Sequence, residues 1–122
     1  TSLNLRRTSA VDLTRALEGL YTGEFLNPAM RDYLLGLMAA RTENDSLYLG
    51  PLAEMLPGAV FYNKRGTSAV PPIVGDMGIL EYQGKTWLIV LSGQPDELVG
   101  SNYPALESSI SRFAEVLAGL LR

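Results

Sequence analysis

The sequence predicts an α+β fold in which an antiparallel meander of three strands packs against helices. Apolar residues recur with a helical period near both ends of the chain, whereas the middle holds three short apolar segments separated by turns rich in Pro and Gly. Helices, then a meander, then one long helix is an order typical of the α+β class. The 122 residues, 47% of them hydrophobic and 19% charged, are enough for a single domain or domain fragment with its own core.

The first predicted helix spans residues 9–22. Ser9 suits the N-terminal cap, with Asp12 three residues later, and Gly23 suits a left-handed stop at the other end. The residues that share one helical face, and are expected in the core, are Leu13, Ala16, Leu17, Leu20 and Tyr21.

The second predicted helix spans residues 28–41 and begins with a cap at Asn27 and a proline at Pro28. Its apolar face consists of Met30, Tyr33, Leu34, Leu37 and Met38. Two methionines in such a face suit either an adaptable binding groove or core packing, and we predict core packing. A third, short helix over residues 49–56 is expected to bury Leu49, Leu52 and Leu56.

Strands are predicted over residues 59–66, 74–82 and 86–92, and a final helix over 104–121. Residues 67–72 contain two prolines and are predicted as a loop, whereas Gly75 and Gly78 suggest a bend or bulge. Gln83-Gly84 predicts a tight hairpin turn. The unbroken run TWLIVLS predicts a third strand that is buried on both faces. The expected core face of the last helix is Leu106, Ile110, Phe113, Leu117 and Leu120 or Leu121.

Composition excludes several classes of function. The chain has no histidine and no cysteine, which excludes Ser-His-Asp catalysis, thiol chemistry and His-ligated metals within these residues. The net charge is −3 and the ten basic residues are scattered, so nucleic acid is not an expected partner. No apolar run reaches the length of a membrane span, and the N-terminus does not resemble a signal peptide.

Two candidate sites in the middle of the chain are excluded by the spacing of their residues. The segment GILEYQGKT has five residues between its glycines where a phosphate loop has four, and it lies in a hairpin. Asp76 and Glu81 are an odd number of residues apart on one strand, so they point to opposite faces and do not form a carboxylate pair. We expect Asp76 to form a structural ion pair with Lys64 or Arg65.

The remaining candidate is Lys64-Arg65-Gly66-Thr67, at the end of the first strand. A lysine beside a glycine that lets a ligand approach the backbone suits an anion-binding edge, although a surface strand ending in a basic turn has the same appearance. A family resemblance bears on this choice. The helical segments TSAVDLTRALEGLYTGE, LNPAMRDYLLGLMAAR and LAEMLPG, followed by VFYNKRGTS, two further strands and PALESSISRFAEVLAGLL, resemble the C-terminal part of class A serine β-lactamases and D,D-peptidases. The similarity extends from about Thr8 to Leu121.

The resemblance implies a role for each residue of this segment. Lys64 would be the lysine of the family's K-T-G strand and supply positive charge near the nucleophile and the substrate carboxylate. Gly66 would let the substrate lie along the strand edge, and the backbone N–H of Thr67 would be one of two oxyanion-hole donors. Arg65 stands where the family usually has a hydroxyl residue, and a guanidinium there can bind a ligand carboxylate in a different geometry.

The family's other motifs do not occur in the chain. No serine or threonine is followed by lysine three residues later, and there is no S-D-N. The resemblance therefore implies a hydrolase that acts on β-lactams or D-Ala-D-Ala peptides through an acyl-enzyme, without a cofactor, in an extracytoplasmic compartment, with its nucleophile outside these residues. The apolar strand 86–92 would be covered by an N-terminal portion of the same protein or by a second copy. The alternatives are a non-catalytic binding or assembly module of this fold and an unrelated α+β interaction domain.

Overall fold

A computed structural model describes residues 8–40, 48–69, 72–94 and 103–122. The helices in these residues are α1 (Ala10–Thr22), α2 (Pro28–Ala39), α3 (Leu52–Met55) and α4 (Tyr103–Leu121), and the strands are β1 (Val60–Ala69), β2 (Pro72–Tyr82) and β3 (Lys85–Gly93). The strands form one antiparallel sheet in the order β1-β2-β3. The predicted α+β class and three-stranded meander are therefore confirmed.

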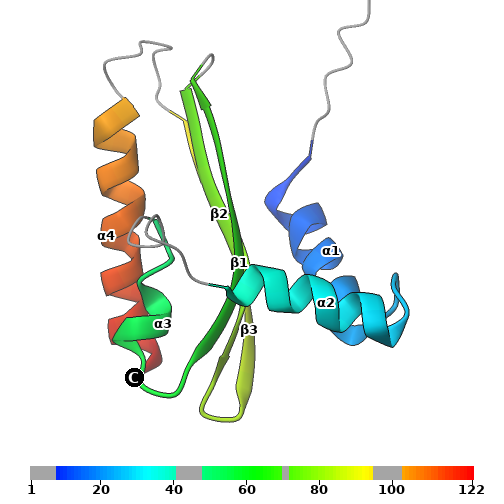
Figure 1. The fold of residues 1–122 in the computed structure, drawn as a ribbon. Coiled ribbons are helices and arrows are strands. Elements are labelled where there is room, and N and C mark those ends of the chain that lie inside the picture. Colours follow the sequence, from blue (N-terminus) through cyan, green and yellow to red (C-terminus); the bar gives the residue numbers. More distant parts are fainter. Residues whose placement is uncertain (1–7, 41–47, 70–71, 95–102) are drawn as a thin grey trace, which may run out of the picture.

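The sheet lies between two pairs of helices (Figure 1). α3 and α4 cover one face, where Phe61 and Leu80 of the sheet are at most 1% exposed. α1 and α2 cover part of the other face, where Leu17 and Leu35 pack on Ile79. Alternation of side chains along each strand assigns consecutive residues to opposite helix pairs.

The register between the strands is continuous. Val60 pairs with Glu81 and Ala69 with Pro72, with one partner for every residue between them, and β2 pairs with β3 in the same uninterrupted way. The register therefore excludes a bulge at Gly75 or Gly78, and the alternative, a bend, stays a prediction. Gly78 is required for another reason, since a Cβ there would lie 2.5 Å from the carbonyl oxygen of Tyr62.

The first two strands extend further than predicted. β1 continues to Ala69 and β2 starts at Pro72, so the prediction of a loop over 67–72 is wrong except at residues 70 and 71, which lie outside the described residues. Pro72 is the first residue of its strand, a position that tolerates a missing backbone donor. The turn at Gln83 and Gly84 is confirmed, with φ of 52° and 73° at the two residues.

Local signals at the ends of α1 and α2 are confirmed. The Ser9 side chain accepts a hydrogen bond from the backbone N–H of Asp12, and the Asn27 side chain accepts one from Met30. Gly23 ends α1 with a left-handed φ of 80°. α2 ends at Ala39, and the predicted last residue of this helix, 41, lies outside the described residues.

The predicted core faces are correct only in part. Leu49, Leu52 and Leu56 are fully buried as expected, although α3 is only four residues long. On α2 the structure buries Leu35, which was not predicted, and leaves most of the predicted face exposed, with fractions of 52% at Met30, 65% at Tyr33, 37% at Leu34 and 56% at Leu37. α2 packs against β1 and Tyr62 through Leu35 and through Met38, a member of the predicted face, so the buried face is rotated relative to the predicted one and shares Met38 with it.

Three further burial predictions fail for related reasons. On α4 the small residues Ala114 and Ala118 are buried in the core, while Phe113 is 41% exposed. Of the alternatives Leu120 and Leu121, Leu121 packs against the core and Leu120 is 75% exposed. On α1, Ala16 is exposed. β3 is only partly buried, with Trp87 40% exposed, because it forms an edge of the sheet in the described residues. None of the helices in the described part of the chain has the length and hydrophobicity that a bilayer crossing requires.

Candidate functional site

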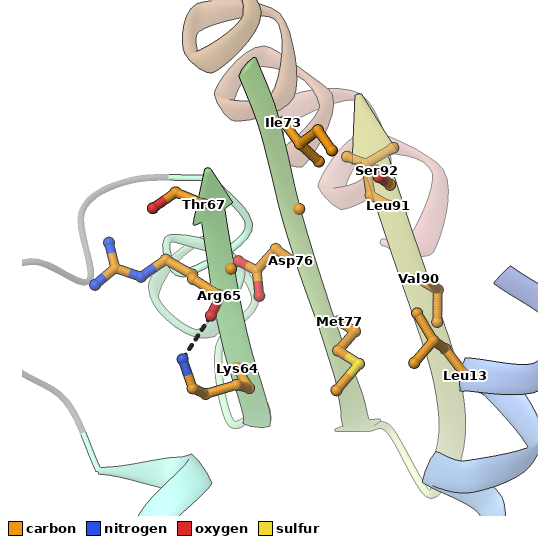
Figure 2. A pocket seen from close by; sticks show the side chains of 12 residues that line it. Leu13, Lys64, Arg65, Thr67, Ile73, Asp76, Met77, Val90, Leu91 and Ser92 are labelled. Atoms are coloured by element: carbon orange, nitrogen blue, oxygen red, sulfur yellow. Dashed lines mark hydrogen bonds between the residues drawn. The ribbon is translucent and has the colours of Figure 1, made fainter. Parts of the chain in front are cut away.

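A groove of about 430 Å³ lies over one end of the sheet, beside the start of α1 (Figure 2). All four residues of the predicted site border it, so the structure brings them together around one open space. The lining residues are Leu13, Lys64, Arg65, Gly66, Thr67, Ile73, Gly75, Asp76, Met77, Val90, Leu91 and Ser92.

The sheet surface at the bottom of the groove is unobstructed, because small residues pair with one another across the three strands. Gly66 pairs with Gly75, and Gly75 pairs with Ser92. A Cβ added at Gly66 would meet nothing within 4 Å, so the glycine is not required by packing within the described residues. Its small size leaves the groove accessible along the β1 backbone, as a ligand aligned with this strand would need.

Lys64 is the lysine of the predicted site and is exposed at the groove. Its Nζ donates a hydrogen bond to the carbonyl oxygen of Arg65 at 2.6 Å (Figure 2). Thr67 is also exposed, three residues further along β1. Since β1 forms an edge of the sheet in the described residues, a ligand can reach the backbone of this segment from the side. The oxyanion role of the Thr67 N–H stays a prediction.

Arg65 points toward the opposite face of the sheet from Lys64. Its guanidinium carbon lies 5.6 Å from the centre of the Tyr48 ring, and Tyr48 packs with Val74 and Ile110 on the α4 side. The idea that this guanidinium binds a ligand carboxylate stays a prediction.

Asp76 is a buried carboxylate behind the groove, with only 2% of its surface exposed. It accepts hydrogen bonds from the Leu49 backbone N–H at 3.0 Å and from Asn63 Nδ2 at 3.0 and 3.2 Å. Burial raises the pKa of Asp76, while these hydrogen bonds and the charge of Arg65 partly oppose the rise. Of the two cations that the sequence suggested as partners, Arg65 lies opposite Asp76 in register and Lys64 lies on the other face. The two principal donors, Asn63 and Leu49, were not predicted.

Glu81 lies on the other face of β2, as its odd separation from Asp76 predicted. The carboxylate accepts hydrogen bonds from the hydroxyls of Tyr21 and Tyr62, the latter at 2.7 Å. These bonds lower the pKa of Glu81, and the bond to Glu81 raises the pKa of Tyr62 to about 12. Arg31 completes the cluster, because its Nε donates to the Tyr21 carbonyl oxygen at 2.6 Å. Sequence analysis missed this cluster, since its members come from four different elements.

Comparison with known proteins agrees with the fold. A family model described as the β-lactamase enzyme family matches residues 2–119. A solved structure of PBP-A superposes with a TM-score of 0.69 at 24% identity, covering 93% of this chain and 40% of that one. A mutant of PBP-A in an acyl-enzyme complex with penicillin G gives 25% identity, a TM-score of 0.69 and the same coverage. The β-lactamase from Sphaerobacter thermophilus DSM 20745 gives 18% identity and a TM-score of 0.65, covering 98% of this chain and 44% of its own.

The chain spans about 40% of the length of the PBP-A structures that it matches. No curated protein matches it significantly. The resemblance drawn from the helices, the K-R-G-T strand and the C-terminal helix is confirmed by the family match, which covers nearly all of the sequence. The chain belongs to the β-lactamase enzyme family.

Proposed function

We propose that this chain is the C-terminal part of a β-lactamase-like serine hydrolase and forms the substrate-side wall of its active site. The substrates would be β-lactams or D-Ala-D-Ala peptides. The observation that carries the proposal is the groove, where β1 of a β-lactamase family member brings Lys64, Gly66 and Thr67 to one open surface. A mutant of PBP-A, at 25% identity to this chain, has been solved as an acyl-enzyme complex with penicillin G, which supports the same chemistry here.

The proposed reaction divides the work between this chain and polypeptide outside the 122 residues. A serine hydroxyl from that polypeptide attacks the carbonyl carbon of the substrate, the C–N bond breaks, and the nitrogen takes up a proton. Water then hydrolyses the ester and restores the hydroxyl. The Lys64 ammonium would attract the substrate carboxylate, and the Thr67 N–H would stabilise the oxyanion. No residue that the chain itself offers matches the S-x-x-K nucleophile.

We further propose that this polypeptide, from the same protein or from a second copy, covers the β3 edge. A second groove of about 470 Å³ runs along that edge and is lined by Trp87, Leu88, Ile89, Val90, Leu117, Leu120 and Leu121. Bare apolar edges of this kind are rare in natural sheets. Hydrogen exchange measures the cover directly. The β3 amides that point away from β2 should exchange slowly in the complete protein, and exchange as fast as at the Gln83-Gly84 turn would contradict the proposal.

Covalent labelling tests the hydrolase. A fluorescent penicillin offered to the complete protein should form a stable or transient adduct, seen on a denaturing gel. Lys64→Ala should reduce the rate of labelling by roughly tenfold or more, because positive charge is lost at the groove. Lys85→Ala is the matched control, since Lys85 is exposed at the start of β3 and lies outside the groove. Absence of any adduct, with the protein folded, would overturn the proposal.

A non-catalytic binding or assembly module of the same fold is the second candidate. The observation that favours it is Arg65, which occupies the usual hydroxyl position and directs its guanidinium to the Tyr48 ring. Such a module would bind penicillin or a cell-wall peptide reversibly and leave no adduct. The coding sequence upstream separates the two candidates, because only the hydrolase requires an S-x-x-K motif there. An extracytoplasmic location is proposed in either case, by analogy with the family.

A further inference from the structure

The residues on either side of Lys64 in the sequence are both held from the face of the sheet opposite the groove. Lys64 faces the groove, whereas Asn63 and Arg65 face α3 and α4, as alternation along a strand requires. Their contacts on that reverse face therefore determine where the β1 backbone presents Lys64.

Asn63 is held by Asp76. Its amide donates to both carboxylate oxygens, at 3.0 and 3.2 Å, in a site where Asp76 is almost completely buried. The same carboxylate accepts the backbone N–H of Leu49 at 3.0 Å. Hydrogen bonds to a buried charge are stronger than average, and removing one leaves a costly unpaired group. Asp76 thus links β1 to the segment that begins with Tyr48 and Leu49.

Arg65 is held by Tyr48 of the same segment. Its guanidinium carbon is 5.6 Å from the centre of the ring, within the range of a cation–π contact, and it lies across from Asp76 in register. Tyr48 is only 3% exposed and is fixed to α4 twice, since its N–H donates to Ser111 Oγ at 3.0 Å and its hydroxyl donates to Glu107. Its φ of 56°, uncommon for a residue other than glycine, is maintained by these contacts.

We infer that Arg65 is a positioning residue for Lys64: through Tyr48 and Asp76 it braces β1 from behind, and it does not bind the substrate carboxylate. The statement about the substrate carboxylate rests on the proposed function. The positioning of β1 by Arg65 rests on the contacts described above. It also explains how a K-R-G sequence serves where the family usually has a hydroxyl residue. Although Arg65 borders the groove, its guanidinium is directed to the Tyr48 ring on the α4 side of the sheet.

Labelling rates of the complete protein distinguish a brace from a carboxylate-binding residue. The rates are measured with a fluorescent penicillin and with its methyl ester, which lacks the carboxylate charge. Arg65→Ala should slow labelling by the free acid by roughly ten- to a hundredfold, because a displaced Lys64 no longer meets the substrate carboxylate and the reacting atoms. If Arg65 acts only through Lys64, the same substitution made in a Lys64→Ala background should leave the ratio of acid rate to ester rate unchanged. A further fall of that ratio in the double variant would show that Arg65 itself binds the carboxylate, and would overturn the inference. Arg112→Ala, which removes an exposed arginine of α4, is the control.

A double-mutant cycle tests the route through Tyr48. If Arg65 acts through the ring, Tyr48→Leu should slow labelling as Arg65→Ala does, and the double variant should be little slower than either. Additive effects would overturn the inference. Thermal unfolding of each variant identifies any that does not fold, and Arg65→Lys then replaces Arg65→Ala, because a lysine keeps the charge without the planar guanidinium.

One measurement on the complete protein is independent of catalysis. Since the charge of Arg65 lowers the pKa of Asp76, Arg65→Ala should raise that pKa further, as followed by NMR of the Asp76 carboxyl carbon, and Arg112→Ala should leave it unchanged. An unchanged pKa in Arg65→Ala would overturn the brace itself. Failure of labelling in the wild type, with the pKa shift present, would instead overturn the proposed function and leave the brace intact.

Discussion

The two faces of the sheet differ in how completely they are covered by helices and packed side chains. On the α3/α4 face, Phe61, Leu80 and Val74 are at most 1% exposed, and the buried carboxylate of Asp76 receives backbone and amide donors. On the α1/α2 face, Ile79 is buried, but the sheet becomes an open groove toward the end that carries Lys64. The closed face therefore supplies most of the stability and fixes the strand, and the open face leaves room for a ligand.

The largest test of this contrast compares the same truncation on the two faces. Leu80 is fully buried on the closed face, and Leu88 is partly buried on the open face. Leu80→Ala should lower the free energy of unfolding by about 3 kcal/mol, and Leu88→Ala by only about 1 kcal/mol, because less surface and a smaller cavity are involved. Urea unfolding followed by circular dichroism measures both. Equal losses would show that the open face is as well packed as the closed one.

A pair of glycines gives the next test, because each faces one side of the sheet. A Cβ at Gly78 would lie 2.5 Å from the Tyr62 carbonyl oxygen and 2.6 Å from Phe61 Cε1, whereas a Cβ at Gly66 would meet nothing within 4 Å. Gly78→Ala should therefore cost about 2 kcal/mol in the free energy of unfolding. Gly66→Ala should change it by less than about 0.5 kcal/mol.

Gly66 also allows the stability of the protein to be tested separately from the access of a ligand to the groove. Because an alanine methyl at position 66 would extend into the groove, Gly66→Ala should slow penicillin labelling of the complete protein although the melting temperature is preserved. A Gly66→Ala variant that unfolds readily would contradict the stability prediction, and one that labels at the wild-type rate would show that the groove is not the ligand path.

The sequence predicted local features of the chain better than it predicted contacts between distant residues. Capping signals such as Ser9 and Asn27, and the Gln83-Gly84 turn, depend on a few neighbouring residues, and the structure confirms them. The groove residues Lys64 to Thr67 were found because a family resemblance pointed to them, and periodicity alone would not have distinguished them from a surface turn.

The predictions that failed concern packing partners distant in the sequence. An apolar stripe on α2 predicts that one face is buried but does not say against what, and most of that stripe is exposed here while Leu35 is buried. The bonds of Glu81 to Tyr21 and Tyr62 join residues 60 and 19 positions apart, and the bond of Asp76 to Leu49 spans 27 positions. No local pattern contains such information, so the supports behind the site emerged only from the three-dimensional arrangement.

A smaller effect on stability is expected from the difference between the helix ends on the two faces. α2 on the open face begins with a side-chain cap at Asn27, whereas α3 on the closed face has no side-chain cap and depends on the burial of Leu52 and its neighbours. Asn27→Ala should cost about 1 kcal/mol in the free energy of unfolding, and Asn27→Ser, which keeps an acceptor oxygen, less than about 0.3 kcal/mol. Similar losses for both substitutions, in the same urea measurement, would contradict the cap.

The smallest expected effect is a difference in pH dependence between the two carboxylates. The pKa of Glu81 is lowered by its tyrosine donors, so the folded state binds fewer protons than the unfolded chain, and the stability that Glu81 contributes is lost as the pH falls through its folded pKa. The pKa of Asp76 is raised by burial, so the folded state binds more protons, and stability is lost as the pH rises through the interval above the ordinary aspartate value of about 3.9.

The two carboxylates are therefore expected to respond to acid in opposite directions. Between pH ~7 and pH ~3, the stability of the wild type relative to Glu81→Gln should decrease, and its stability relative to Asp76→Asn should increase. Urea unfolding of the three proteins across this interval gives both differences. Parallel curves for the two variants would mean that the buried and the tyrosine-bound carboxylate experience the same environment, and the contrast between the faces would then be limited to the packing of apolar side chains.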